Sequence, residues 1–309
     1  MMRRHDGILV LDKPRGLTSR DALNKAWKWL PRGTRIGHAG TLDPMATGVL
    51  LACVGRGTRL VEFLHHLPKT YRADILFGAR STTDDADGDI TPVPLPPDPG
   101  AEAFTCLLAS FTGDIMQAPS AVSAVKVAGQ RAYHLARKGR EIDLPPRPVR
   151  IDGIQLLRFS WPEATIRVHC GKGTYIRSIG RDLGAALGTA AYLTDLCRER
   201  VGDFTQADAI PLDTPAPQAL QRMQPLARAI QAMPRFEIAG ETLDRLLQGQ
   251  KPTRDQLLAL GADLPELPTD QLLALLHQGE LKLLAHWRDG QLRPRKVFLG
   301  PEDWTTPTT

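Results

Sequence analysis

Residues 38–48 have the sequence HAGTLDPMATG and run directly into VLLACV, residues 49–54, an unbroken apolar run of strand length. Such a run, closed here by a Gly-Arg-Gly segment, predicts a buried strand. Glycines at positions 37, 40 and 48 leave the backbone free on both sides of Asp43, and Pro44 biases Asp43 toward an extended conformation. We therefore expect Asp43 to stand on a short loop at the mouth of a buried strand, where scaffolds often present reactive side chains.

Asp43 has two interpretations. From these residues alone, it could simply stabilise an Asp-Pro turn, because aspartate, glycine and proline dominate turns. The segment also resembles the catalytic loop of the TruB family, the bacterial tRNA pseudouridine-55 synthases. The resemblance implies that Asp43 is the essential nucleophile and that His38 lies against the target nucleotide.

Further segments resemble the same family in the same order along the chain. They are residues 7–14, residues 69–71 with 82–88, residues 117–137, and residues 171–177 with the continuation to Leu196, so that the resemblance covers roughly residues 7–210. It implies five further site residues: Tyr71 stacks on the target uridine, Asp85 and Arg177 belong to the charge network, Tyr175 positions the uridine, and Leu196 contacts it from the following helix.

The implied reaction sets chemical requirements for the site. Conversion of uridine to pseudouridine breaks the C1′–N1 bond, rotates the base while it is held, and joins C5 to C1′ without net redox change, so we expect no cofactor. A carboxylate can act as the nucleophile if it is ionised. A guanidinium such as that of Arg177 favours the ionised form and can hold it through two hydrogen bonds. Addition of Asp43 to the base, attack on the sugar and abstraction of a sugar proton remain three alternatives.

The position of Arg177 follows from pattern. Residues 165–170 alternate between apolar and polar side chains, which predicts a strand, and Gly-Lys-Gly then turns the chain. Ile176, Ile179, Leu183 and Leu187 recur at helical spacing. Arg177 shares a helix face with Arg181, and this face is expected to point away from the apolar stripe. The alternative to a catalytic role is a solvated basic face.

His38 and Tyr71 each have a structural alternative. A single histidine before a glycine-rich turn is often a hydrogen-bonded loop residue, and a single tyrosine is often part of the core. An enzyme that acts on a base inside a folded loop must extrude that base and hold it against flat side chains. Stacking on an aromatic ring contributes roughly 1–3 kcal/mol per base. We expect Tyr71 to stack, and as a hypothesis its hydroxyl could also take the C5 proton.

Three rival motifs fail. If Gly88 is placed at position 6 of a calcium loop, Thr83 and Pro94 fall where carboxylates are required. The glycines after residue 54 lack the third glycine of a dinucleotide fingerprint. The cysteines, at 53, 106, 170 and 197, are too dispersed for a zinc site. We therefore expect neither a metal nor a bound nucleotide.

Charge favours a polyanionic partner. The chain has a formal net charge of +5, and between Lys126 and Arg150 there are seven cations against two acids. Concentrated cations are typical of phosphate binding, and the alternative for any single one of them is a solvated helix face. In the family this region, about residues 117–150, is an insertion that closes on the tRNA T arm, so Lys126 and Arg137 are candidate substrate-binding residues. The segment departs from the family pattern at Ser120 and Val122.

Length and composition agree with a cytoplasmic enzyme. A chain of 309 residues can form a large core and a smaller domain. The apolar stretch at residues 8–11 is too short for a signal peptide, and we expect no membrane span. Dispersed cysteines fit a reducing compartment. Residues 92–100 are expected to form a proline-rich loop, and residues 211–225 a connector.

The C-terminal third resembles the small β-barrel, PUA-type domain of TruB proteins in residues 236–251 and 279–299. Residues 287–290 are expected to form a turn and residues 293–297 a basic strand. Residues 256–276 are rich in leucine and are expected to be more helical than that domain usually is. The implied function of this domain is to contact the acceptor end of tRNA, and the alternative is a stabilising appendage.

Together these observations predict an α+β protein. Its catalytic domain, residues 1–234, is expected to have a mixed, mostly antiparallel sheet, followed by a PUA-like domain at 235–300 and a disordered tail at 301–309. The expected activity is isomerisation of the T-loop uridine, U55, of tRNA, with no protein partner. Two alternatives are a tRNA-binding folding chaperone with secondary catalysis, and a synthase for a uridine in another RNA.

Overall fold

The computed structural model describes residues 5–120, 126–127, 130–131, 144–259 and 268–299. The predicted tail at 301–309 and most of the predicted insertion lie outside these residues. None of the helices in the described ranges is long and apolar enough to span a membrane.

Ten strands form one large sheet, in the order β14-β1-β3-β12-β4-β11-β10-β7, with β2 paired to β3 and β13 paired to β12. Their bounds are β1 (Gly7–Lys13), β2 (Ile36–His38), β3 (Thr47–Val54), β4 (Lys69–Phe77), β7 (Gly113–Gln117), β10 (Arg147–Ser160), β11 (Glu163–Cys170), β12 (Ala191–Val201), β13 (Phe204–Thr205) and β14 (Ile210–Pro211). The pairs β1–β14 and β3–β12 are parallel, and the other pairs among these strands are antiparallel. The predicted mixed, mostly antiparallel sheet is therefore confirmed.

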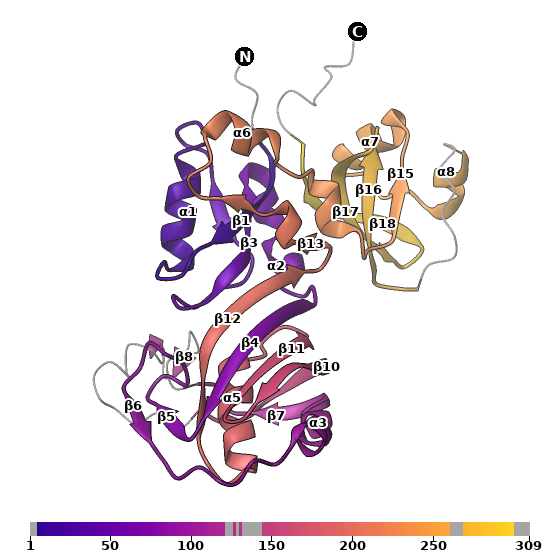
Figure 1. Cartoon of the computed structure of the whole chain (residues 1–309). Helices are drawn as coiled ribbons and strands as arrows, with labels where there is room; N and C mark the ends of the chain where they lie inside the picture. The colour runs from indigo at the N-terminus through magenta and orange to yellow at the C-terminus, as the bar shows by residue number, and fades with distance from the viewer. Residues whose placement is uncertain (1–4, 121–125, 128–129, 132–143, 260–267, 300–309) are drawn as a thin grey trace.

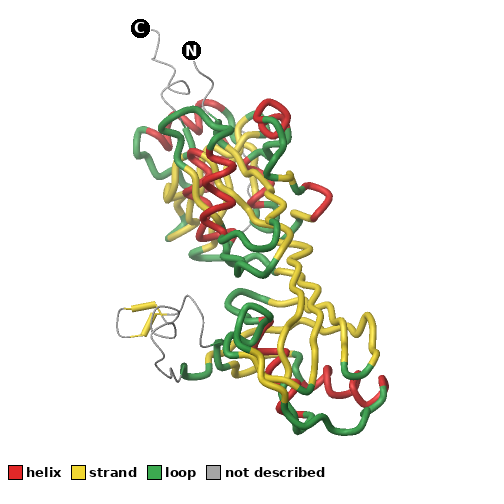
Figure 2. Tube along the Cα trace, turned by 60° about the vertical axis from the view of Figure 1, so that its left-hand side comes forward, coloured by secondary structure: helices red, strands yellow, loops and turns green. Residues whose placement is uncertain are grey.

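The long strands β4 and β12 pair along most of their length and join two halves of the molecule (Figure 1). Figure 2 shows the same yellow strands running between the upper and lower bodies. In the upper body, β3 is buried on both faces, because Leu50, Ala52 and Val54 belong to one core cluster and Val49, Leu51 and Cys53 to another. The unbroken apolar run after the Asp43 loop is thus explained by burial on two sides.

The helices that accompany the ten-stranded sheet, in both bodies, are short. They are α1 (Ser19–Trp27), α2 (Val61–Leu64), α3 (Ala101–Ser110), α5 (Ile176–Ala186) and α6 (Ala216–Gln221), with 3-10 turns η1 (Gly55–Leu60), η2 (Gln206–Asp208) and η3 (Leu226–Ile230). Two small hairpins pair β5 (Ala79–Ser81) with β6 (Ile90–Pro92), and β8 (Lys126–Val127) with β9 (Gln130–Arg131). The predicted strand at 165–170, helix from Ile176 and loop before Gly100 are confirmed as β11, α5 and the segment after β6. Residues 211–225 connect as predicted but contain α6.

A second sheet of four strands forms the C-terminal small β domain, in the order β15-β16-β17-β18. Its elements are β15 (Arg235–Glu237), α7 (Gly240–Leu247), α8 (Arg254–Ala259), β16 (Gln271–His277), β17 (Glu280–Arg288) and β18 (Gln291–Val297). Asp289 and Gly290 both have positive φ and form the predicted turn, and the basic residues 293–297 lie on β18.

Residues 256–276 were expected to be largely helical. The helix α8 does include residues 256–259, but residues 271–277 form the strand β16, so the expectation is wrong for that segment. Alternate residues of β16 pack on opposite sides. Leu273 and Leu275 join the core of the small domain, while Ala274 and Leu276 join a cluster shared with β1 and β3. Two-sided burial gives a continuous leucine-rich run that periodicity alone cannot separate from a helix.

Candidate active site

Asp43 lies on the loop between β2 and β3, and this loop is held by buried polar groups. The ammonium of Lys13, which is fully buried at the end of β1, donates to the carbonyl oxygens of Pro44 (3.2 Å) and Ala46 (2.6 Å). The Ser19 hydroxyl, at the start of α1, accepts from the Leu42 N–H at 2.8 Å. The backbone on both sides of Asp43 is therefore fixed to β1 and α1.

Arg177 connects two carboxylates from distant parts of the chain. Its Nη2 lies 3.0 Å from Oδ2 of Asp43, and its Nη1 lies 3.3 Å from Oδ2 of Asp85. The side chains of Arg177 and Asp85 are buried, at 3% and 5% exposure, whereas the Asp43 side chain is 36% exposed. One end of the guanidinium is thus held in the protein interior, and the other meets a carboxylate that remains accessible.

Further hydrogen bonds fix this charge network. Nη1 of Arg177 also donates to the Thr83 carbonyl oxygen (2.7 Å) and to the Ser120 hydroxyl (3.2 Å). The second oxygen of Asp85 accepts from the Thr83 hydroxyl and from the Asp87 N–H at 3.1 Å. A buried carboxylate and a buried guanidinium require such partners, because an unpaired buried charge is strongly unfavourable.

The alternative of a solvated basic face is wrong for Arg177, because its side chain is only 3% exposed. Arg177 and Arg181 do share one face of α5, but that face is covered by the loop around Asp84 and by the segment before Ser120. Segments distant in sequence bury this face, so helical spacing could not reveal it.

A cavity of about 310 Å³ opens beside Asp43. Besides Asp43, its lining includes Tyr71, Tyr175, Arg177, Leu196 and Arg198, together with Gly40–Leu42, His65, Lys69, Gly171–Thr174 and Ile176. Five predicted site residues therefore converge here. Asp85 lies behind Arg177 rather than in the lining.

Three strands position the side chains in the cavity wall. On β4, Tyr71 pairs with Val168 of β11 and with Arg198 of β12. Leu196 also lies on β12, opposite Ala73, so its predicted placement on a helix is wrong. This segment forms a strand because it pairs with β4 along most of its length. Its own sequence is short and mixed in polarity, and it does not indicate that partner strand. At the start of α5, Gln117 accepts from the Tyr175 N–H (2.8 Å) and donates to its carbonyl oxygen (3.1 Å).

Burial shifts the pKa of three titratable groups of the cavity wall, and for His65 it lowers the pKa. It raises the pKa of Tyr71, with Arg198 acting in the opposite direction, so the hydroxyl is protonated at neutral pH. It lowers the pKa of Lys69 to about 8, and Lys69 donates to the His65 carbonyl oxygen at 2.6 Å.

The sequence analysis missed Arg198, which is almost fully buried under the Asp43 loop. Its guanidinium donates to the carbonyl oxygens of Val49 (2.7 Å), Gly40 (3.1 Å) and Thr41 (3.3 Å). Arg198 follows Leu196 by two residues and shares its face of β12, but this spacing was no signal while the segment was expected to be a helix.

The remaining predicted residues lie elsewhere. His38 is on β2, half-buried and outside the cavity lining. Its Nδ1 has no hydrogen-bond partner within the described ranges, and burial lowers its pKa, which favours the neutral ring. Lys126 lies on β8, where side chains are not described, and Arg137 lies outside the described residues. In the described part of the chain, no group of three His, Cys, Asp or Glu residues is placed to hold a metal ion.

The chain is similar in sequence to known proteins over most of its length. Residues 28–176 match the sequence model of the TruB family pseudouridylate synthase N-terminal domain. The chain is 39% identical to tRNA pseudouridine synthase B of Gluconacetobacter diazotrophicus over 304 residues, which is 95% of this chain and 97% of the relative. It is 40% identical to tRNA pseudouridine synthase B of Cupriavidus metallidurans over 302 residues, which is 94% and 93% of the two chains.

Solved structures of more distant proteins share the fold. A Cbf5-Nop10-Gar1 complex contains a chain with a TM-score of 0.72 and 24% identity, and the match covers 96% of this chain and 86% of that one. A chain of an H/ACA RNP bound to a substrate RNA has a TM-score of 0.73 and 22% identity, with 97% and 87% coverage.

Proposed function

Because this chain belongs to the TruB family of pseudouridylate synthases, we propose that it isomerises the T-loop uridine of tRNA, U55, to pseudouridine, with Asp43 as the nucleophile. The relatives are named for tRNA as the substrate. The observation that supports the assignment of Asp43 is its contact with Arg177, at 3.0 Å, on the wall of a cavity large enough for a flipped base.

The residues around Asp43 orient its carboxylate and stabilise its negative charge. The Arg177 guanidinium orients the Asp43 carboxylate, and a charge-assisted pair of this kind stabilises the negative charge of a nucleophile. Asp85, Thr83 and Ser120 hold Arg177 from behind, so the positive charge is preorganised before substrate arrives.

Tyr71 is assigned to base stacking. It stands on β4 within the cavity lining, and aromatic stacking holds a base without regard to its hydrogen bonds. Acceptance of the C5 proton by Tyr71 would require the ionised hydroxyl, which burial disfavours. Tyr175 and Leu196 complete the walls, and His38 would reach the nucleotide from the β2 side of the loop.

We also propose a role in tRNA binding for each of the larger parts of the chain. Residues 1–234 form the catalytic domain, and the insertion at about 117–150, with Lys126 and Arg137, closes on the T arm. Residues 235–300 form a PUA-like domain that contacts the acceptor end. Four free cysteines, of which three are buried, support a cytoplasmic location.

The test is to incubate the purified protein with an unmodified tRNA transcript and to locate pseudouridine by base-specific derivatisation and primer extension. We expect one new stop in the T loop, absent with Asp43→Asn. Asp12→Asn is the matched control, because Asp12 is exposed on β1 outside the cavity. If no stop appears while salt-sensitive tRNA binding is intact, the chaperone or another RNA substrate would replace this proposal.

A further inference from the structure

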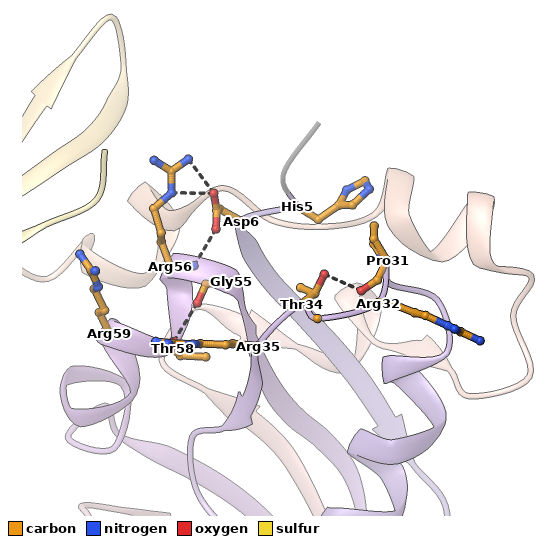
Figure 3. A pocket seen from close by; sticks show the side chains of 11 residues that line it. His5, Asp6, Pro31, Arg32, Thr34, Arg35, Gly55, Arg56, Thr58 and Arg59 are labelled. Atoms are coloured by element: carbon orange, nitrogen blue, oxygen red, sulfur yellow. Dashed lines mark hydrogen bonds and ion pairs between the residues drawn. The ribbon is translucent and has the colours of Figure 1, made fainter. Parts of the chain in front are cut away.

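A second cavity, of about 550 Å³, lies at the end of β3 that is remote from Asp43 (Figure 3). It is lined by His5, Asp6, Pro31–Arg35, Gly55, Arg56, Thr58 and Arg59. None of these residues takes part in the site described above. Four of them are arginines, from two separate segments that meet here because β2 and β3 are paired.

The four arginines fall into two classes. Arg56 forms an ion pair with Asp6, in which its Nε and Nη2 each lie 2.6 Å from Oδ2 of the carboxylate. Arg59 donates to the Val297 carbonyl oxygen of the small β domain. Arg32 and Arg35 are exposed, and within the described ranges neither forms a hydrogen bond or an ion pair through its side chain.

Hydrogen bonds and close packing fix the backbone that lines the cavity. The Gly55 N–H donates to the Arg35 carbonyl oxygen at 2.8 Å, and the Thr58 hydroxyl donates to the Gly55 carbonyl oxygen at 2.7 Å. Gly55 has a φ of +59°, and a Cβ at this position would lie 2.1 Å from Oδ1 of Asp6. In Figure 3 the side chain of Arg35 runs beside Thr58, beneath the Asp6–Arg56 pair.

The electrostatics of the cavity favour an anion. Asp6 is the one acid in its lining, so the four guanidinium groups leave a surplus of positive charge. Across the junction with the small domain, Lys296 of β18 donates to the Arg59 carbonyl oxygen, and Glu62 pairs with both Lys296 and Arg295. Guanidinium groups that have donors to spare match the geometry of phosphate oxygens.

We propose that this cavity, the Arg32–Arg35 pocket, is a second phosphate-binding site that holds the backbone of the RNA substrate outside the modified loop. This inference rests on the proposed function for the identity of the RNA. The strand β3 begins beside the catalytic loop and ends at the pocket, so the two sites lie on the order of 25 Å apart at about 3.3 Å per residue. A full tRNA can span this distance, whereas an isolated T-arm hairpin held in the catalytic cavity offers fewer phosphates there.

The position of the pocket also fits an RNA that continues toward the small β domain. Asp6 and Arg56 contribute to an adjoining groove, which is completed by Gly279–Lys282 and Phe298 of that domain. The pocket therefore adjoins the small β domain at the end of β3 that is remote from Asp43.

The test compares two RNAs and four proteins. Dissociation constants are measured for an unmodified full-length tRNA transcript and for its isolated T-arm hairpin, each at several salt concentrations. The proteins are the full chain, the double variants Arg32→Gln/Arg35→Gln and Arg32→Lys/Arg35→Lys, and Arg158→Gln. Arg158 is an exposed arginine on β10, in the lower body, and serves as the control for the loss of one exposed charge.

We expect the double variant to bind full-length tRNA about 10-fold more weakly, and to lower the slope of log K against log salt by about 1 to 2, because two phosphate contacts are lost. Binding of the hairpin should change less than about two-fold, and Arg158→Gln should behave like the parent chain with both RNAs. The variant Arg32→Lys/Arg35→Lys should recover most of the affinity, since an ammonium still binds phosphate as a point charge.

Three outcomes would overturn the proposal: unchanged binding of both RNAs, equal losses for both RNAs, or an equal loss for Arg158→Gln. Unchanged tRNA binding combined with a phosphate-induced rise in Tm that the double variant lacks would identify a free-anion site instead. Pseudouridine formation in the hairpin is measured in parallel. Pseudouridine formation in the full-length transcript is measured as well, and its absence with the parent chain would refute the proposed activity without affecting the binding result.

Discussion

The Ser120 hydroxyl lies 3.2 Å from Nη1 of Arg177, in a position where neither side chain is open to solvent. The same hydroxyl donates to the Thr83 carbonyl oxygen at 3.2 Å. Ser120 therefore links the guanidinium that holds Asp43 to the loop that carries Asp85. It is also one of the two positions at which the sequence of this segment was expected to depart from the family pattern.

Ser120→Ala tests that contact. Loss of one buried hydrogen bond should lower the free energy of unfolding by about 0.5–1.5 kcal/mol. Arg177 retains Asp43, Asp85 and the Thr83 carbonyl, so kcat should fall only a few-fold while KM stays constant. Urea unfolding and single-turnover kinetics measure the two effects. Ser110→Ala, at the exposed end of α3, is the control, and an equal loss of kcat there would contradict a specific contact.

Arg198→Lys should have a larger effect on the rate. The guanidinium donates to three carbonyl oxygens beneath the catalytic loop, and an ammonium cannot span the same three positions. A shift of about 1 Å in a reacting group can cost about 100-fold in rate. We therefore expect kcat to fall at least 10-fold while the Kd for tRNA changes little.

Arg200→Lys provides the comparison for Arg198→Lys. Arg200 lies two residues further along β12, and its side chain is 51% exposed in a pair with Asp203. The same change should leave kcat within about two-fold there. If Arg198→Lys weakened tRNA binding as much as it slowed the reaction, Arg198 would bind substrate rather than position the loop.

The parts of the fold that were predicted correctly are those with a local pattern. The Asp43 loop, β3, β11 and α5 each carry their signal within about ten residues, through glycines, an apolar run or a helical stripe. The contact between Asp43 and Arg177 was anticipated through family resemblance, and no pattern within either segment points to the other.

The parts that were missed depend on partners distant in sequence. Leu196 lies on a strand because β12 pairs with β4, more than a hundred residues earlier in the chain. The Arg177 face of α5 is buried because the loop around Asp84 folds over it. Arg198 appeared to be one of several charges in a polar stretch, and only the sheet shows that it turns inward beneath the Asp43 loop.

Tyr71→Phe separates stacking from proton transfer. The phenyl ring keeps the aromatic face, whereas the hydroxyl, whose pKa burial raises, is lost. If Tyr71 acts by stacking, the Kd for tRNA should stay within about two-fold and kcat within about five-fold. Tyr71→Ala should then weaken substrate binding by roughly 1–3 kcal/mol, the contribution of one stacked base. A loss of kcat of more than about 100-fold in Tyr71→Phe, with binding intact, would assign the C5 proton to this hydroxyl.

The lowered pKa of Lys13 leads to a prediction for alkaline pH: its contribution to stability should rise with pH, whereas kcat should fall. Burial lowers its pKa from 10.5 to about 8, while the Asp43 charge acts in the opposite direction. Because this folded value lies below the unfolded one, the folded chain binds fewer protons between about pH 8 and 10.5, and the contribution of Lys13 to stability rises with pH through that window. Over the same range the ammonium that holds the carbonyl oxygens of Pro44 and Ala46 loses its charge. We therefore expect kcat to fall as pH rises through about 8.

Lys69 complicates the interpretation, because burial lowers its pKa to about 8 as well and it lines the cavity. Lys69→Arg removes that titration and should leave the decline of kcat near pH 8 in place, whereas Lys13→Arg should move the decline to higher pH, since a guanidinium stays charged. The measurements are kcat from pH 6 to 9.5 and urea unfolding at the same pH values. If Lys69→Arg abolished the decline, the titrating group would be Lys69, and the ammonium beneath the Asp43 loop would not control the rate. That result would hold even if Lys13→Arg failed to fold in its fully buried position.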